Sequence, residues 1–139
     1  MRIETKRLII TEFDPEMARV VCENSLDDDT RKYVPDEVFE TEDDAKETIR
    51  YLISQYKTND GPLVYPILTK NDENIGYVQI APIDGGWEIG YHIAKKYTGN
   101  GYATEAVSVF LPVIAEKKAL SAIYGICLKE NAASVRVLN

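Results

Sequence analysis

The pattern of apolar and polar positions in the first part of the chain predicts a strand followed by two helices. Apolar side chains alternate through residues 5–13, which is typical of a strand. Asp14 and Pro15 come next, in the places of a helix N-cap and a first-turn residue, and they predict a helix to about Leu26. A capping-box-like start at Thr41 predicts a second helix, in which apolar residues recur at helical spacing and mark a face directed at the core. These recurring residues are Ile49, Leu52, Ile53 and Tyr56.

The middle of the chain predicts an antiparallel meander. Three apolar segments are separated by short turns rich in Asn, Asp and Gly, and they fall at residues 63–68, 75–80 and 87–94. A long helix over about residues 102–118, a strand at 122–128 and a last helix from Asn131 are expected to follow. Pro112 falls inside the long helix and predicts a kink there, because proline removes one backbone hydrogen bond and crowds the preceding turn.

Two glycines flank one asparagine at the junction between the last meander strand and the long helix. Gly99, Asn100 and Gly101 therefore form a loop that leads directly into a helix N-terminus. Such a junction offers unpaired backbone N–H groups and the positive end of the helix dipole, both of which favour a phosphate. Glycine also lets the backbone approach a ligand closely. The alternative is a strand-turn-helix corner in which the glycines are only structural.

Length, charge and cysteine content narrow the possible functions. The 139 residues, 45% of them hydrophobic, predict one domain over residues 1–139. A net charge of −7 argues against a nucleic-acid surface and suits an amine acceptor, although acidity also serves solubility. Two cysteines and one histidine give no disulfide framework or His-rich metal site, and no metal is expected. Without a signal segment or a membrane-spanning stretch, we expect a cytoplasmic protein with no membrane partner.

A segment near the end of the sequence completes a set of three motifs. Residues 130–138 read Glu-Asn-Ala-Ala-Ser-Val-Arg-Val-Leu, residues 5–10 read Thr-Lys-Arg-Leu-Ile-Ile, and residues 88–91 read Glu-Ile-Gly-Tyr. With the glycine loop, these segments resemble the GNAT superfamily of acetyl-CoA-dependent N-acetyltransferases, and most closely its ribosomal-protein N-terminal acetyltransferase branch. The resemblance implies the α/β (α+β) GNAT acyl-CoA N-acyltransferase fold, a mixed and mostly antiparallel sheet with helices on both faces. GNAT members usually continue past the point where this sequence stops, so we expect the final strand to be missing and the open sheet edge to favour a homodimer.

The same resemblance implies that acetyl-CoA is bound as a co-substrate. Backbone groups of Tyr91, His92 and Ile93 would pair with the pantetheine arm and polarise the thioester carbonyl. The side chain of Asn131 would contact the pantetheine arm, and its alternative role is that of a helix N-cap. The backbone cradle for the pyrophosphate would come from Thr98, Gly99, Asn100, Gly101, Tyr102, Ala103 and Thr104.

Three residues are candidates for proton transfer. Glu88 matches a strand carboxylate that acts as the base in several GNAT members, often through water, and its alternative is a solvated carboxylate at the start of a strand. His92 shares that face of the strand by alternation and is a rival base because histidine titrates near neutrality, unless it is only a neighbour of the cofactor. Ser134 is the candidate acid for the leaving thiolate, and its alternative is a helix-start residue. Leu138 stands where other branches carry a tyrosine acid, which disfavours the polyamine-acetyltransferase branch.

The expected function is transfer of an acetyl group from acetyl-CoA to a primary amine, by direct attack in a ternary complex. The branch resemblance favours a protein or peptide N-terminal amine as the acceptor. A small-molecule amine acceptor, or a non-catalytic acyl-CoA-binding or assembly module, remains open as an alternative.

Overall fold

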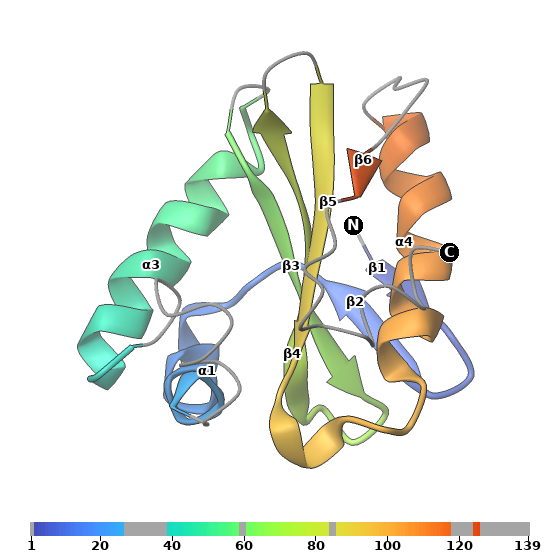
Figure 1. The fold of residues 1–139 in the computed structure, drawn as a ribbon. Coiled ribbons are helices and arrows are strands. Elements are labelled where there is room, and N and C mark those ends of the chain that lie inside the picture. Colours follow the sequence, from blue (N-terminus) through green and yellow to red (C-terminus); the bar gives the residue numbers. More distant parts are fainter. Residues whose placement is uncertain (1, 27–38, 59–60, 84–85, 118–123, 126–139) are drawn as a thin grey trace.

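The computed structural model describes residues 2–26, 39–58, 61–83, 86–117 and 124–125, and Figure 1 shows the arrangement of their elements. Within these residues, turns and two short 3-10 helices connect the strands and helices. In chain order the elements are β1 (Arg2–Glu4), β2 (Leu8–Thr11), η1 (Pro15–Met17), α1 (Ala18–Ser25), α3 (Glu42–Gln55), β3 (Leu63–Thr69), β4 (Asn74–Ile83), β5 (Gly86–Ile93), η3 (Lys95–Tyr97), α4 (Tyr102–Lys117) and β6 (Tyr124–Gly125).

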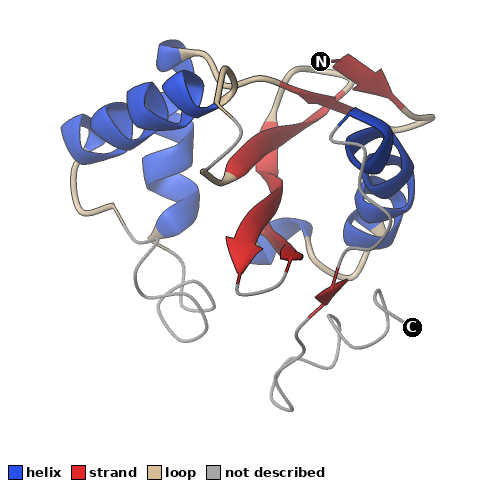
Figure 2. Ribbon diagram, turned by 90° about the horizontal axis from the view of Figure 1, so that it is seen from above, coloured by secondary structure: helices blue, strands red, loops and turns tan. Residues whose placement is uncertain are grey.

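The sheet follows the order of the chain, β1-β2-β3-β4-β5-β6. Neighbours from β1 to β5 are antiparallel, whereas β6 is parallel to β5, with Glu88 opposite Tyr124 and Ile89 opposite Gly125. The helices α1 and α3 cover one face of the sheet and α4 covers the other, as both views show (Figures 1 and 2). The predicted mixed, mostly antiparallel sheet with helices on both faces is therefore confirmed.

Each face of the sheet has its own hydrophobic core. On the α4 face, the apolar side of α4 packs on inward-pointing residues of β2 to β5. The α1 and α3 face has a smaller core, in which Ala45 and Ile49 of α3 meet Ala18 and Cys22 of α1. Since successive strand residues point to opposite faces, the two cores divide the central strands between them. The largest fully buried side chains are Tyr65, Phe110, Leu8, Ile10, Ile49, Leu63, Ile67, Ile75, Ile80, Ile114 and Val78.

The strand expected over residues 5–13 is present as β2 but is shorter, and β1, which the sequence pattern did not predict, precedes it and pairs with it in a hairpin. Thr5 makes the turn: its N–H donates to the carbonyl of Leu8 at 2.8 Å, and its Oγ1 accepts from the N–H of Leu8 at 2.8 Å. The two predicted N-cap residues, Asp14 and Thr41, do cap their helices. Asp14 Oδ1 accepts from the N–H of Glu16 at 2.9 Å, although the first turn is 3-10, and Thr41 Oγ1 accepts from the N–H of Asp44 at 3.1 Å.

The later expectations are met where the structure describes the chain. The meander of β3, β4 and β5 is confirmed, and α4 continues through Pro112 to Lys117, with the kink remaining a prediction. Only Tyr124–Gly125 of the strand expected at 122–128 is described, and the helix expected from Asn131 lies outside the described residues. None of the helices in the described part of the chain combines the length and the apolar character needed to cross a membrane.

Two stacked tyrosines in the core differ in whether their hydroxyl groups have hydrogen-bond partners. The rings of Tyr56 and Tyr65 lie 4.9 Å apart. Tyr56 Oη accepts from the N–H of Phe13 at 3.0 Å and donates to the carbonyl of Val64, whereas no partner for Tyr65 Oη is found among the described residues. Burial raises the pKa of Tyr65 to about 12.

We expect Tyr65→Phe to raise the free energy of unfolding by about 1 kcal/mol, because it removes an unsatisfied buried hydroxyl. Tyr56→Phe is expected to lower it by about 1–2 kcal/mol, because two backbone groups lose their partner. Urea denaturation of both variants measures these changes, and a loss of stability in Tyr65→Phe as large as that in Tyr56→Phe would contradict this description of the core.

Candidate active site

The loop between β5 and α4 has the geometry of an anion site. Gly99 and Gly101 have φ values of +81° and +77°, in the left-handed region that favours glycine. A Cβ added at Gly99 would meet no atom within 4 Å, so the space beside the loop is open. The first backbone hydrogen bond of α4 runs from the N–H of Glu105 to the carbonyl of Gly101 at 3.1 Å. Within the described residues, the N–H groups of the three residues between them have no backbone acceptor, as in the first turn of any helix.

Arg7, in the β1–β2 hairpin, ties this loop to the sheet. Its Nη1 donates to the carbonyl of Asn100 at 2.8 Å, and its Nε donates to Glu105 Oε1 at 2.6 Å. Glu105 also accepts from the hydroxyl of Thr5 and from the backbone N–H of Arg7. The guanidinium lies 4.6 Å from the centre of the Tyr102 ring. Residues more than 90 positions apart in the sequence therefore hold the glycine loop in place together.

The charges around the loop suit an anionic ligand. Partial burial raises the pKa of Glu105, but hydrogen bonds from Thr5 and Arg7 outweigh this effect and hold the pKa below its ordinary value. Lys95 and Lys96 lie in η3, directly before the loop. Cationic side chains and free N–H groups are what a diphosphate requires, so the residues present fit the pyrophosphate of acetyl-CoA.

The Glu105 contacts predict a pH-dependent contribution to stability. Because the pKa of Glu105 is lowered in the folded state, its contribution is present above the unfolded pKa of about 4.3 and is lost as the pH falls through the folded pKa. We expect Glu105→Gln to lower the free energy of unfolding by about 1 kcal/mol at neutral pH, a value that allows for solvent screening of the partly exposed Arg7. The difference from the wild type should close in acid.

Urea denaturation at several pH values measures this difference. The matched control is Glu23→Gln, which removes the partner of Arg19 in an exposed i,i+4 pair and should change the free energy of unfolding by less than about 0.5 kcal/mol. A gap between the wild type and Glu105→Gln that stays constant from neutral pH into acid would show that the carboxylate charge is not the source.

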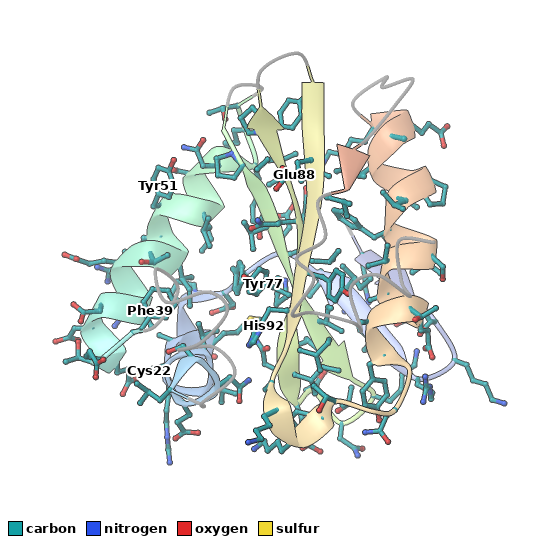
Figure 3. The ribbon with its side chains drawn as sticks, in the orientation of Figure 1. Cys22, Phe39, Tyr51, Tyr77, Glu88 and His92 are labelled. Carbon is teal, nitrogen blue, oxygen red and sulfur yellow. The ribbon has the colours of Figure 1, made fainter. Side chains whose placement is uncertain are left out.

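The two faces of β5 carry different kinds of residues. Tyr91, with Trp87 and Ile89, packs against the core on the α4 face. His92 points to the opposite face, where its ring centre lies 5.9 Å from that of Tyr77 (Figure 3). Glu88 is four residues earlier on the same strand, which places the two Cα atoms about 13 Å apart at about 3.3 Å a residue. The structure therefore does not bring Glu88 and His92 together.

A cavity of about 200 Å³ lies on the His92 face of the sheet, between the sheet and the helices α1 and α3. Aromatic and aliphatic side chains make most of its lining, and the described lining includes His92 but not Glu88. Phe39, Tyr77 and His92 face this region in Figure 3. Gly90 lies between Glu88 and His92 on this face of β5 and has no side chain. The side chain of Gln79 packs over it, so that a Cβ added at Gly90 would lie 3.0 Å from Gln79 Nε2.

The remaining expected site residues are Asn131, Ser134 and the backbone of Tyr91, His92 and Ile93. Asn131 and Ser134 lie outside the described residues. The backbone of β5 at Tyr91, His92 and Ile93 pairs with β4 on one side, while its described pairs with β6 involve only Glu88 and Ile89. In an antiparallel pair every second residue directs its N–H and C=O away from the partner strand, so part of this backbone faces the β6 side.

Sequence reasoning missed three residues that shape the site. Thr5 and Arg7 carried the family resemblance, but nothing near them in sequence linked them to the glycine loop or to Glu105. Asn74 of β4 borders the cavity, although in the sequence it only ends a polar stretch between two strands. No local pattern pairs side chains that are about a hundred residues apart.

Comparisons with protein families, with curated proteins and with solved structures all match this chain to acetyltransferases. The family model for the acetyltransferase (GNAT) domain matches residues 7–139. The uncharacterized N-acetyltransferase YnaD of Bacillus subtilis (strain 168) is 34% identical over 140 residues, which cover 99% of this chain and 79% of that protein. The crystal structure of a GNAT-family acetyltransferase from Bacillus anthracis has a TM-score of 0.83 at 28% identity, and covers 99% of this chain and 80% of that one.

A more distant structure shares the fold. RimL, a ribosomal L7/L12 alpha-N-protein acetyltransferase in complex with coenzyme A, has a TM-score of 0.82 at 17% identity, and covers 99% of this chain and 80% of that one. The matched family model and the YnaD alignment both extend over nearly the whole sequence. This chain therefore belongs to the GNAT acetyltransferase family.

Proposed function

We propose that this acetyltransferase transfers the acetyl group of acetyl-CoA to a primary amine by direct attack in a ternary complex. The observation that carries the proposal is the glycine loop, whose free N–H groups at the head of α4 lie at the end of the strand that carries His92. The proposed anion site therefore follows β5 in the chain, and His92 of the same strand lines the cavity proposed for the acceptor.

The residues of the loop bind and orient the donor. The N–H groups of Tyr102, Ala103 and Thr104 hold the pyrophosphate, with Gly99 and Gly101 allowing its close approach. Acetyl-CoA supplies a thioester, whose acyl group is transferable to an amine. Backbone groups of β5 around Tyr91 and Ile93 direct the pantetheine arm, and a backbone N–H there stabilises the oxyanion that develops on the thioester carbonyl.

His92 is the base that we propose. An ammonium group has no lone pair for attack, so the acceptor must lose a proton first. His92 lines the cavity, and histidine is the side chain that most often acts as a general base. Glu88 remains the alternative base, acting through water from farther along the same strand face.

We further propose a protein or peptide N-terminal amine as the acceptor. Its support is the fold shared with RimL, an alpha-N-protein acetyltransferase, and the motif resemblance to the ribosomal-protein branch. A small-molecule amine is the second candidate, because the cavity beside His92, which residues of α1, α3 and the sheet line, has a volume of only about 200 Å³.

The experiment has two steps. Calorimetric titration with acetyl-CoA tests the donor site, and a thiol-release assay with short peptides and small primary amines tests transfer. Release of coenzyme A that depends on a peptide with a free N-terminus, and stops when that N-terminus is blocked, would support the peptide acceptor. Binding of acetyl-CoA without transfer to any amine would instead favour the non-catalytic module.

A further inference from the structure

The described lining of the cavity beside His92 is uncharged. Its described lining residues include no Asp, Glu, Lys or Arg, and aromatic and aliphatic side chains such as Phe13, Phe39, Leu52 and Val64 form most of it. A charged group that enters such a site loses its hydration without gaining an ion pair, which is strongly unfavourable. The volume of about 200 Å³ is below the roughly 300–1,000 Å³ of pockets for drug-sized ligands, so it suits one group of side-chain size.

Among the described residues of the lining, Asn74 carries a buried side-chain donor without a partner. Asn74, at the start of β4, is 6% exposed. Its Oδ1 accepts from the N–H of Gly76 at 3.0 Å, and its carbonyl accepts from Asn24 Nδ2 at 2.8 Å. Because an N–H donor requires an oxygen, the Gly76 bond fixes the orientation of the amide and leaves Nδ2 as the remaining donor. Within the described part of the chain, Asn74 Nδ2 has no acceptor.

A buried donor without a partner is unfavourable, and such groups are rare in folded proteins. Asn74 borders a cavity that also contains the proposed base, so a bound ligand is a natural source of the missing acceptor. A ligand that offers a neutral oxygen to Asn74 Nδ2 and apolar surface to the rest of the lining would satisfy both features at once.

We propose that this cavity binds the group next to the acceptor's amine, and that it selects an uncharged apolar group with one neutral hydrogen-bond acceptor, which Asn74 Nδ2 recognises. The inference rests on the proposed function, since it assumes that the amine is presented to His92. It adds the chemical class of the acceptor: acceptors whose group beside the amine is anionic or cationic are excluded.

Three amines test the proposal. Phenethylamine is the hydrocarbon reference, 4-methoxyphenethylamine adds a neutral acceptor oxygen, and 4-(2-aminoethyl)benzoate replaces it with a carboxylate. Each is titrated into the protein saturated with coenzyme A, and kcat/KM is measured for each with acetyl-CoA. We expect the methoxy amine to be preferred over phenethylamine by about tenfold, and the carboxylate to be the poorest in both measurements.

Two variants assign the preference to the cavity. Leu52→Phe adds bulk inside it and should weaken binding of the methoxy amine by at least about tenfold while acetyl-CoA binding is unchanged. Asn74→Asp keeps the oxygen that accepts from Gly76 and removes the donor, so the advantage of the methoxy group over hydrogen should disappear. The control is Val20→Phe, which adds more bulk than Leu52→Phe but on the exposed surface of α1, and it should change neither measurement.

The outcomes separate the two proposals. If coenzyme A is released with these amines but the three react equally, or if Leu52→Phe has no effect on them, the cavity inference is wrong and the proposed function stands. If the amines bind with the expected preference but no acetyl group is transferred, the cavity inference stands and the proposed reaction is wrong. Thermal unfolding of each variant reports whether it is folded. If Asn74→Asp does not fold, the result for Leu52→Phe decides the inference.

Discussion

Replacing Thr104 with glutamate is expected to weaken acetyl-CoA binding by at least about tenfold while leaving the protein as stable or slightly more stable. Thr104 is exposed in the first turn of α4, beside the free N–H groups of the proposed phosphate cradle. A carboxylate there repels the pyrophosphate, yet it interacts favourably with the positive end of the helix, an effect of about 0.3–1 kcal/mol. Binding and stability should therefore change in opposite directions.

The matched control is Thr104→Gln, which has the same size as the glutamate variant without its charge. Calorimetry with acetyl-CoA should give nearly wild-type affinity for glutamine and the loss for glutamate, and the difference should shrink as salt is added, because salt screens exposed charges. Equal affinities in the two variants would place the diphosphate elsewhere. Since a glutamate at Gly101 would also strain a backbone with φ of +77°, Thr104 gives the cleaner test.

Replacing His92 with glutamine is expected to lower kcat by about 100-fold or more, with acetyl-CoA affinity unchanged. Glutamine keeps a polar side chain of similar reach but cannot take a proton. The cradle at α4 does not involve this side chain, so the effect should fall on the chemical step. The wild-type rate should fall in acid as an imidazole becomes protonated, and this limb of the pH profile should be absent in His92→Gln.

Glu88→Gln discriminates between the two candidate bases. It lies on the same strand face, about 13 Å from His92 and away from the described lining of the cavity. We expect a much smaller loss of kcat in this variant. A larger loss from Glu88→Gln than from His92→Gln would falsify the assignment, and would move the acceptor amine toward the start of β5.

Local sequence patterns predicted most of the architecture correctly. The turns of the meander, the caps at Asp14 and Thr41, and the glycine loop before α4 are each defined by neighbouring residues, so the sequence alone was sufficient for them. The N-terminal hairpin was missed because β1 has only three residues and its turn at Thr5 continues the same alternation of side chains. Strand alternation also assigned His92 and Tyr91 to opposite faces of β5 correctly.

What the sequence by itself determined is the family, the order of elements and the location of the glycine loop, because these depend on residues close together in the chain. The tertiary structure alone decided which distant residues meet. It placed Arg7 on Asn100 and Glu105, and it enclosed Asn74 and His92 in one cavity while leaving Glu88 outside its described lining. The physical reason is that these contacts are made through the packing of strands and helices far apart in sequence, and neither periodicity nor local propensity carries information about such pairs.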